Sequence, residues 1–104
     1  MNSVREGVGR IKGFNPLLQA PARLQVMAIL AQAQDAEFAR LREITGTSDS
    51  VLSKHLAGLA EAGFIRVRKA TSDGRQRTWA SVTRIGRRTF DDHVKALERI
   101  IAGG

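Results

Sequence analysis

The sequence predicts one α+β domain that is mainly helical and carries a small antiparallel β-hairpin. Three observations lead to this fold class. Apolar residues recur at helical spacing over residues 21–62 and again after residue 84. Between these regions the period changes to two, as in paired strands with one exposed face. The chain has 104 residues, which is enough for one hydrophobic core and too few for two.

The first 13 residues are assigned to an N-terminal arm with two alternative structures. Three glycines favour a flexible arm, because glycine inside a helix costs about 1 kcal/mol. Ser3 and Glu6 have the spacing of a capping box and favour a short docking helix instead. The domain itself is assigned to residues 14–104.

The first helix of this domain is predicted over residues 21–33. Pro21 fits its first turn, where the missing N–H is not needed. Apolar residues nearly encircle this helix, which indicates that more than one of its sides is covered.

Two further helices joined by a tight turn are predicted over residues 37–45 and 48–62. Gly46 is suited to end the first of them in a left-handed conformation, and Ser48 to cap the second. The second helix has leucines on one face and small, polar or cationic residues on the other. Its backbone could therefore approach a DNA groove without steric obstruction.

A basic hairpin and a last helix complete the domain. One strand begins at Phe64, the second covers residues 77–83, and residues 72–74 have the composition of a turn. Thr83 is suited to cap a final helix over about residues 84–102.

The positive charge of the chain is concentrated in one segment. The formal net charge is +7, and residues 64–90 contain eight basic side chains against one acid, Asp73. The remaining residues carry equal numbers of basic and acidic groups. A clustered cationic surface attracts a polyanion, and nucleic acid is the commonest such partner of a small domain. An anionic membrane surface is the weaker alternative.

Several other classes of function are not expected. With no cysteine and two histidines, we expect no disulfide, no metal site and no cofactor. Asp91, Asp92 and His93 are consecutive, but neighbours on a helix point about 100° apart, so no enzyme activity is predicted. The sequence has neither the apolar length of a membrane span nor a signal peptide, and a cytoplasmic, nucleoid-associated protein is expected.

Three motifs, in this order, resemble the winged helix-turn-helix transcriptional regulators of the MarR and ArsR groups, especially their compact stand-alone members. The run NPLLQAPARLQVMAIL is similar to the first helix of that family. FARLREITGTSDSVLSKHLAGLAEAGFIRVRK resembles its helix-turn-helix, and DGRQRTWASVTRIGRR resembles its wing. The resemblance covers residues 14–95, and the long terminal additions of full MarR proteins are largely missing. Their ligand pocket is therefore not carried over.

The resemblance implies a recognition helix over residues 48–62 in the major groove and a wing reaching toward the minor groove. On the helix, the candidate DNA contacts are Ser48, Asp49, Ser50, Val51, Ser53, Lys54 and His55. On the wing, they are Arg75 and Arg77, with Arg68 and Lys69 on its stem. The expected function is that of a sequence-specific regulator of transcription that binds double-stranded DNA. We also expect it to act by repression and to respond to an unidentified small-molecule effector. A winged helix that binds protein or RNA is the alternative.

Some of these residues have a second interpretation. Asp49 either stabilises the helix N-terminus or accepts a hydrogen bond from cytosine. His55 either contacts a phosphate or is partly buried beside the wing. Trp79 has three interpretations: it packs on the hairpin, it packs at a subunit contact, or it stacks on a ligand. The three arginines at the start of the last helix are either solvated or phosphate contacts.

A homodimer is predicted from apolar surface that one small core cannot absorb. The last helix carries a stripe of four apolar side chains, and the alternative is that it packs on the first helix of the same chain. The stripe consists of Phe90, Val94, Leu97 and Ile101. A dimer would read a near-palindrome with half-sites about one helical turn, or a multiple of it, apart.

Overall fold

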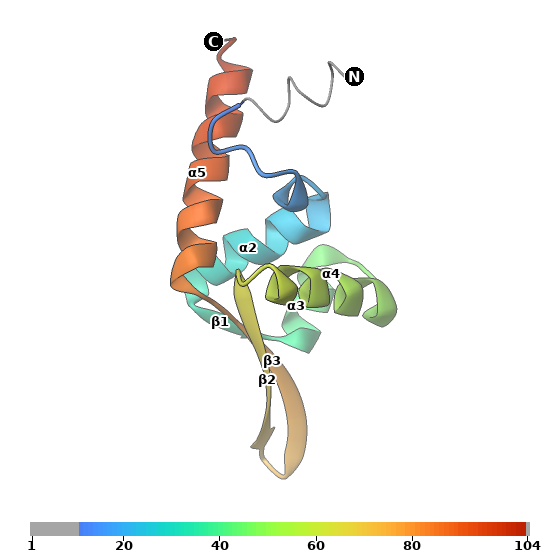
Figure 1. Cartoon of the computed structure of the whole chain (residues 1–104). Helices are drawn as coiled ribbons and strands as arrows, with labels where there is room; N and C mark the ends of the chain where they lie inside the picture. Colours follow the sequence, from blue (N-terminus) through green and yellow to red (C-terminus); the bar gives the residue numbers. More distant parts are fainter. Residues whose placement is uncertain (1–10, 104) are drawn as a thin grey trace.

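The computed structural model describes residues 11–103 and confirms the predicted α+β fold class (Figure 1). The predicted arm, residues 1–13, lies mostly outside the described residues. The molecule is elongated, with extents of 52 × 25 × 22 Å, because the hairpin and α5 project toward opposite ends. The elements in chain order are η1 (Pro16–Leu18), α2 (Pro21–Ala33), β1 (Asp35–Glu37), α3 (Phe38–Thr45), α4 (Asp49–Glu61), β2 (Ile65–Ser72), β3 (Arg75–Val82) and α5 (Arg84–Ile101).

The helix ends follow from local chemistry that the sequence predicted. Pro21 occupies the first turn of α2. Gly46 ends α3 with a φ of 67°, and its N–H donates to the Arg42 carbonyl. The Ser48 hydroxyl accepts a hydrogen bond from the Val51 N–H at 3.3 Å, which caps α4. Thr83 caps α5 in the same way.

The sheet has three antiparallel strands in the order β1-β3-β2, one strand more than predicted. β1 has only three residues, which is too short to show a period of two, and it pairs with the base of β3 through Ala36 and Ala80. Asp73 and Gly74 form the hairpin turn with φ values of 53° and 74°, and the Asp-Gly pair suits such a tight turn.

The hairpin extends beyond the core, and the predicted alternation holds only at its base. Ile65 is 2% exposed, whereas Val67, which should share its face, is 43% exposed. Hydrogen bonding between β2 and β3 continues to the turn although little of the domain lies beneath them. The strands are therefore held together mainly by their backbone ladder.

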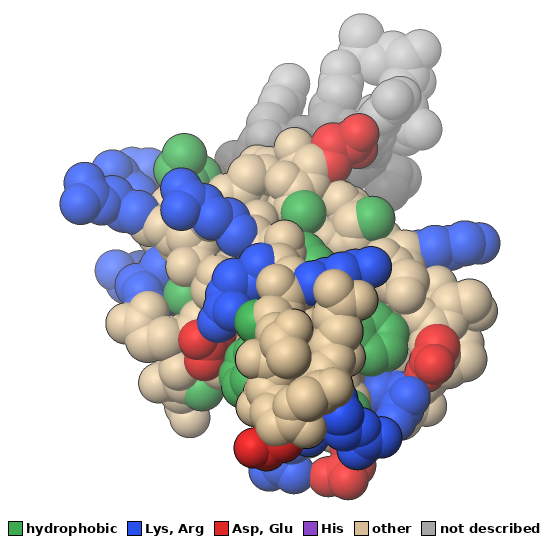
Figure 2. Space-filling view, turned by 90° about the horizontal axis from the view of Figure 1, so that it is seen from below, with side chains coloured by type: hydrophobic (Ala, Val, Ile, Leu, Met, Phe, Trp, Pro, Cys, Tyr) green, Lys and Arg blue, Asp and Glu red, His purple; other side chains and the backbone are tan. Residues whose placement is uncertain are grey.

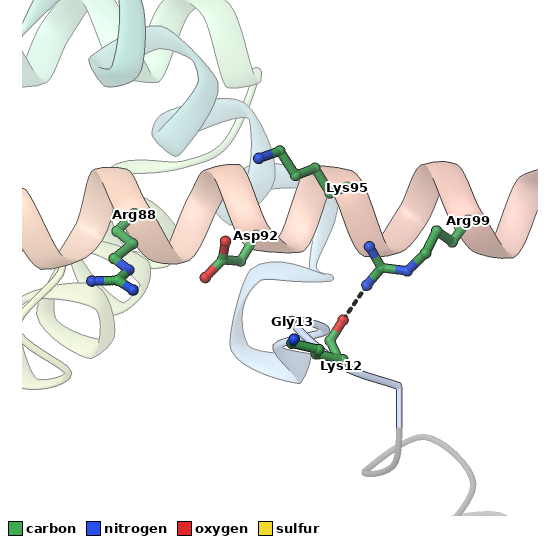
Figure 3. A pocket seen from close by; sticks show the side chains of 6 residues that line it. All are labelled: Lys12, Gly13, Arg88, Asp92, Lys95 and Arg99. Atoms are coloured by element: carbon green, nitrogen blue, oxygen red, sulfur yellow. Dashed lines mark hydrogen bonds between the residues drawn. The ribbon is translucent and has the colours of Figure 1, made fainter.

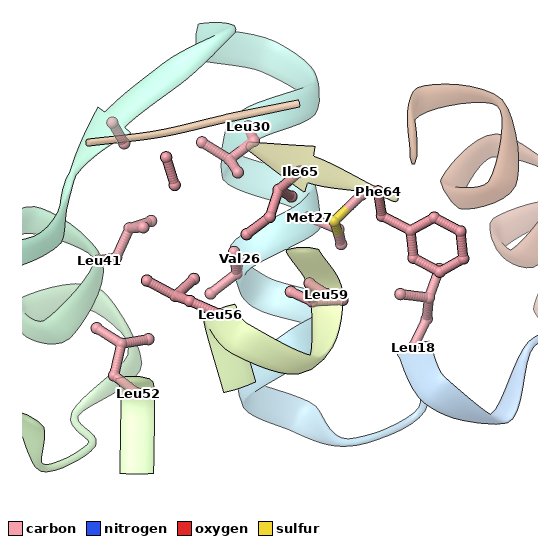
Figure 4. Close-up of a cluster of buried hydrophobic side chains, with 12 residues drawn as sticks. Leu18, Val26, Met27, Leu30, Leu41, Leu52, Leu56, Leu59, Phe64 and Ile65 are labelled. Atoms are coloured by element: carbon pink, nitrogen blue, oxygen red, sulfur yellow. The ribbon is translucent and has the colours of Figure 1, made fainter. Parts of the chain in front are cut away.

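The hydrophobic core lies around α2 and receives side chains from every layer of the domain (Figure 4). This burial on several sides explains why apolar residues nearly encircle α2. Phe90 of α5 packs against the same core. The buried side chains drawn with labels are Leu18, Val26, Met27, Leu30, Leu41, Leu52, Leu56, Leu59, Phe64 and Ile65.

The face that α5 buries differs from the stripe noted in the sequence. Its buried residues are Gly86, His93 and Ala96, while Ile101 is 83% exposed. His93 lies against the segment before α2, where its Nδ1 accepts a hydrogen bond from the Asn15 N–H at 2.9 Å. A buried polar side chain thus fixes α5 to the N-terminal part of the domain.

Candidate nucleic-acid interface

The outer face of α4 presents short and cationic side chains to solvent. Of the seven residues predicted as DNA contacts on this helix, six are exposed and His55 is half-buried. The buried side of α4 is formed by Leu52, Leu56 and Leu59, so packing against the core fixes which face is presented.

Asp49 stands at the first position of α4 and is paired with Arg42 of α3. The Arg42 guanidinium donates to the Asp49 carboxylate at 2.8 Å, and this hydrogen bond raises the pKa of Arg42. The carboxylate is also close to the N-terminal end of the helix dipole, which favours a negative charge. Both observations support the interpretation of Asp49 as a residue that stabilises the turn between α3 and α4.

His55 is half-buried on the inner edge of the same helix. Burial lowers the pKa of its imidazole, and the charge of Arg23 lowers it further. A lowered pKa keeps this histidine neutral near pH 7.

The basic side chains of the hairpin differ in their partners within the protein. Lys69 and Arg75 are exposed, and neither forms an ion pair with any acid in residues 11–103. Arg68 lies 3.7 Å from the carboxylate of Asp35. Arg77 is half-buried and donates to both carboxylate oxygens of Glu37 at 3.0 and 3.1 Å.

Trp79 packs on the hairpin itself. It is half-buried and lies opposite Arg68 in the β2–β3 register. The Arg68 guanidinium is 5.6 Å from the centre of the indole ring, which is cation–π distance. Sequence reasoning identified both residues but not their contact, because strand register depends on the position of the turn.

A shallow hollow of about 280 Å³ joins the outer face of α4 to the hairpin. Ser53 lines it from α4, and Val67 and Thr78 line it from β2 and β3. Helix and hairpin therefore border one continuous surface. The remaining lining residues are Phe38, Leu56, Ala57 and Ala60. This hollow could not be predicted from the sequence, because it depends on how α4 packs against the sheet.

Positive side chains surround the hairpin when the molecule is seen from its tip (Figure 2). Lysine and arginine side chains border this face on several sides, and fewer acidic side chains lie among them. The hairpin projects from the face, so a long polyanion could contact the α4 surface and the hairpin together. No helix within residues 11–103 has the length and apolar character needed to cross a membrane.

Comparisons with known proteins agree with this geometry. A family model described as a winged helix DNA-binding domain matches residues 22–101. An uncharacterised protein of Methanocaldococcus jannaschii is 31% identical over 84 residues, covering 81% of this chain and 87% of that protein.

Solved structures show the same fold. A transcriptional regulator homologue from Pyrococcus horikoshii superposes with a TM-score of 0.82 at 22% identity, covering 98% of this chain and 97% of that chain. A MarR family transcriptional regulator from Silicibacter pomeroyi superposes with a TM-score of 0.66 at 20% identity, over 83% of this chain and 56% of that one. The resemblance to MarR proteins is thus confirmed at the level of the fold.

Proposed function

Because this chain belongs to the family of winged helix DNA-binding domains, we propose that it is a transcriptional regulator that binds a specific double-stranded DNA sequence. The observation that carries the proposal is the surface shared by the outer face of α4 and the basic hairpin. A duplex that receives α4 in its major groove would meet the hairpin at the adjacent backbone and minor groove.

Within this proposal, α4 supplies sequence selection. Ser53 and Lys54 lie on its exposed face and would contact base edges or phosphates. Val51 is 43% exposed and is suited to pack against the methyl group of a thymine. Ser48 and Ser50 stand at the helix start, where the free N–H groups also favour a phosphate, whereas the Asp49 carboxylate is paired with Arg42.

The hairpin supplies affinity that depends little on sequence. Arg75 and Lys69 have no ionic partner within the described chain, so we assign them the phosphate contacts. Arg77 is held by Glu37 and Arg68 by Trp79 and Asp35, so we assign these two mainly to orienting the hairpin.

The test begins with selection of bound sequences from random duplexes by the full chain. Affinity for the selected duplex is then measured over a range of salt concentrations. Arg75→Ala should weaken binding to all duplexes and reduce the slope of log K against log salt by about 0.9. Arg40→Ala removes the same charge from α3 and should leave the slope unchanged. Equal slopes for both variants, or no enriched duplex, would contradict the proposal.

We further propose that the protein acts as a homodimer that represses by occupying a near-palindromic operator. The support is apolar surface at the end of α5, where Ile100 is 45% and Ile101 is 83% exposed. Ile101→Glu, combined with Leu97→Glu, should yield a monomer in light scattering. Ile85→Glu is a control because this residue is 62% exposed at the other end of α5. A monomeric unmodified protein would contradict the dimer.

A further inference from the structure

A second cationic site lies on α5, apart from the hairpin. A cavity of about 400 Å³ is bounded by one side of α5 and by the segment before η1 (Figure 3). We call it the α5 pocket. Its lining consists of Lys12, Gly13, Arg88, Asp92, Lys95 and Arg99. Four of these residues are basic and one is acidic, so the lining has an excess of three positive charges.

The pocket exists because the N-terminal segment is fixed against α5. Arg99 donates a hydrogen bond to the Lys12 carbonyl, as drawn in Figure 3. Asn15 donates to His93 Nδ1 at 2.9 Å, and the Phe14 and His93 rings are 5.0 Å apart. Gly13 has a φ of 83°, and a Cβ there would lie 2.8 Å from the Asp92 carbonyl oxygen. This close approach seats residues 12 and 13 beside the basic face of the helix.

The basic side chains of the pocket outnumber its one acid, Asp92. None of its four basic side chains forms an ion pair with an acid in the described part of the chain. Arg88 and Arg99 extend to the side of α5 along which residues 12 and 13 pass (Figure 3). Like charges brought together repel one another, and a bound anion would remove this repulsion. The projecting hairpin lies at the other end of the molecule, so the DNA surface proposed above does not account for these charges.

We propose that the α5 pocket binds a small multivalent anion, with carboxylate or phosphate groups, that bridges α5 and the N-terminal segment. The volume is in the range of small-molecule sites, and guanidinium groups suit planar carboxylates and phosphates. Binding of the anion does not depend on the function proposed above. Only its use as an effector of DNA binding rests on that function.

The test is calorimetric titration of the full chain with pyrophosphate and with citrate, each at constant ionic strength. Saturable binding with one site per chain is expected for at least one of them. Arg88→Gln with Lys95→Gln should weaken it by about tenfold or more, because both side chains are exposed and their loss leaves the fold intact. Lys54→Gln with Lys69→Gln is the matched control, since it removes the same charge from the proposed DNA surface.

A second variant tests the geometry separately from the charge. Gly13→Ala keeps every basic group but displaces the segment from α5, so it should also weaken anion binding. Absence of saturable binding to both anions would overturn the proposal. So would equal weakening by the two charge-matched pairs, or unchanged affinity in Gly13→Ala. Duplex binding measured on the same variants is a separate readout, so a failure of the pocket and a failure of the DNA proposal are distinguishable.

Discussion

Replacement of Gly86 by alanine tests the contact that places α5 on the DNA-binding part of the domain. A Cβ at this position would lie 2.0 Å from the carbonyl oxygen of Phe64 and 2.7 Å from its carbonyl carbon. Ordinary contacts begin at 3.4 Å, so α5 and the start of β2 would have to separate by roughly 1.4 Å. Both groups belong to the backbone, and no change of rotamer can relieve the overlap.

The expected loss of stability follows from this overlap and from the hydrogen bonds beside it. Overpacking costs about 1–3 kcal/mol, and more where nothing can yield. The Thr83 N–H donates to the same Phe64 carbonyl at 3.0 Å, and weakening that bond adds about 1 kcal/mol. We therefore expect Gly86→Ala to lower the free energy of unfolding by about 2–4 kcal/mol.

Gly58 provides the matched control on another helix. A Cβ at Gly58 in α4 would meet no atom within 4 Å. Gly58→Ala should raise the free energy of unfolding by about 0.5–1 kcal/mol, because alanine is the better helix former. Urea unfolding followed by circular dichroism measures both variants. If the free energy of unfolding of Gly86→Ala differs from that of the unmodified protein by less than about 1 kcal/mol, the close approach of α5 to the start of β2 is wrong.

Three further predictions concern polar contacts. Burial lowers the pKa of His93, so the unfolded chain binds a proton at a higher pH than the folded protein does, and the free energy of unfolding should fall as the pH drops below about 6.5. His93→Gln should reduce this pH dependence, which urea titrations at several pH values measure. Thr83→Ala should lower stability by about 1–2 kcal/mol, and Thr83→Ser by less, because the hydroxyl accepts from Gly86 and donates to Gly63. Glu37→Gln should lower the free energy of unfolding by about 1 kcal/mol and speed amide exchange in β3, because Arg77 loses its charged partner. An unchanged exchange rate would argue against a role of the Glu37–Arg77 pair in fixing the hairpin.

Local chemistry predicted most of the elements but not their contacts. Proline, glycine and hydroxyl residues at helix ends act over a few positions, so the bounds of α2 and α4 could be predicted closely from sequence. β1 was not predicted, because a strand of three residues is too short to show an alternating pattern and its pairing depends on β3, which is distant in the sequence.

The residues of the candidate interface could be predicted from the sequence, but their contacts with other parts of the protein could not. Residue type and clustering predicted the candidate DNA contacts of α4, and six of those seven residues are exposed. The Glu37–Arg77 pair joins residues 40 positions apart, so only the fold reveals that this arginine is engaged. The buried role of His93 depends likewise on Asn15 and Gln19, which lie 78 and 74 positions away.

The basic residues of the hairpin differ in their ion-pair and cation–π partners, which explains how the hairpin can keep a fixed direction and still attract a polyanion. A hairpin with little core beneath it has no packing to fix its direction, so its orientation must be set at the base. There, β1 pairs with β3, and Glu37 holds Arg77 while Trp79 lies under Arg68. Lys69, next to Arg68 on β2, and Arg75, beside the turn, have no such partners in the described chain. The basic groups that are paired within the protein therefore stabilise the direction of the hairpin, and the unpaired ones keep their charge available to a polyanion.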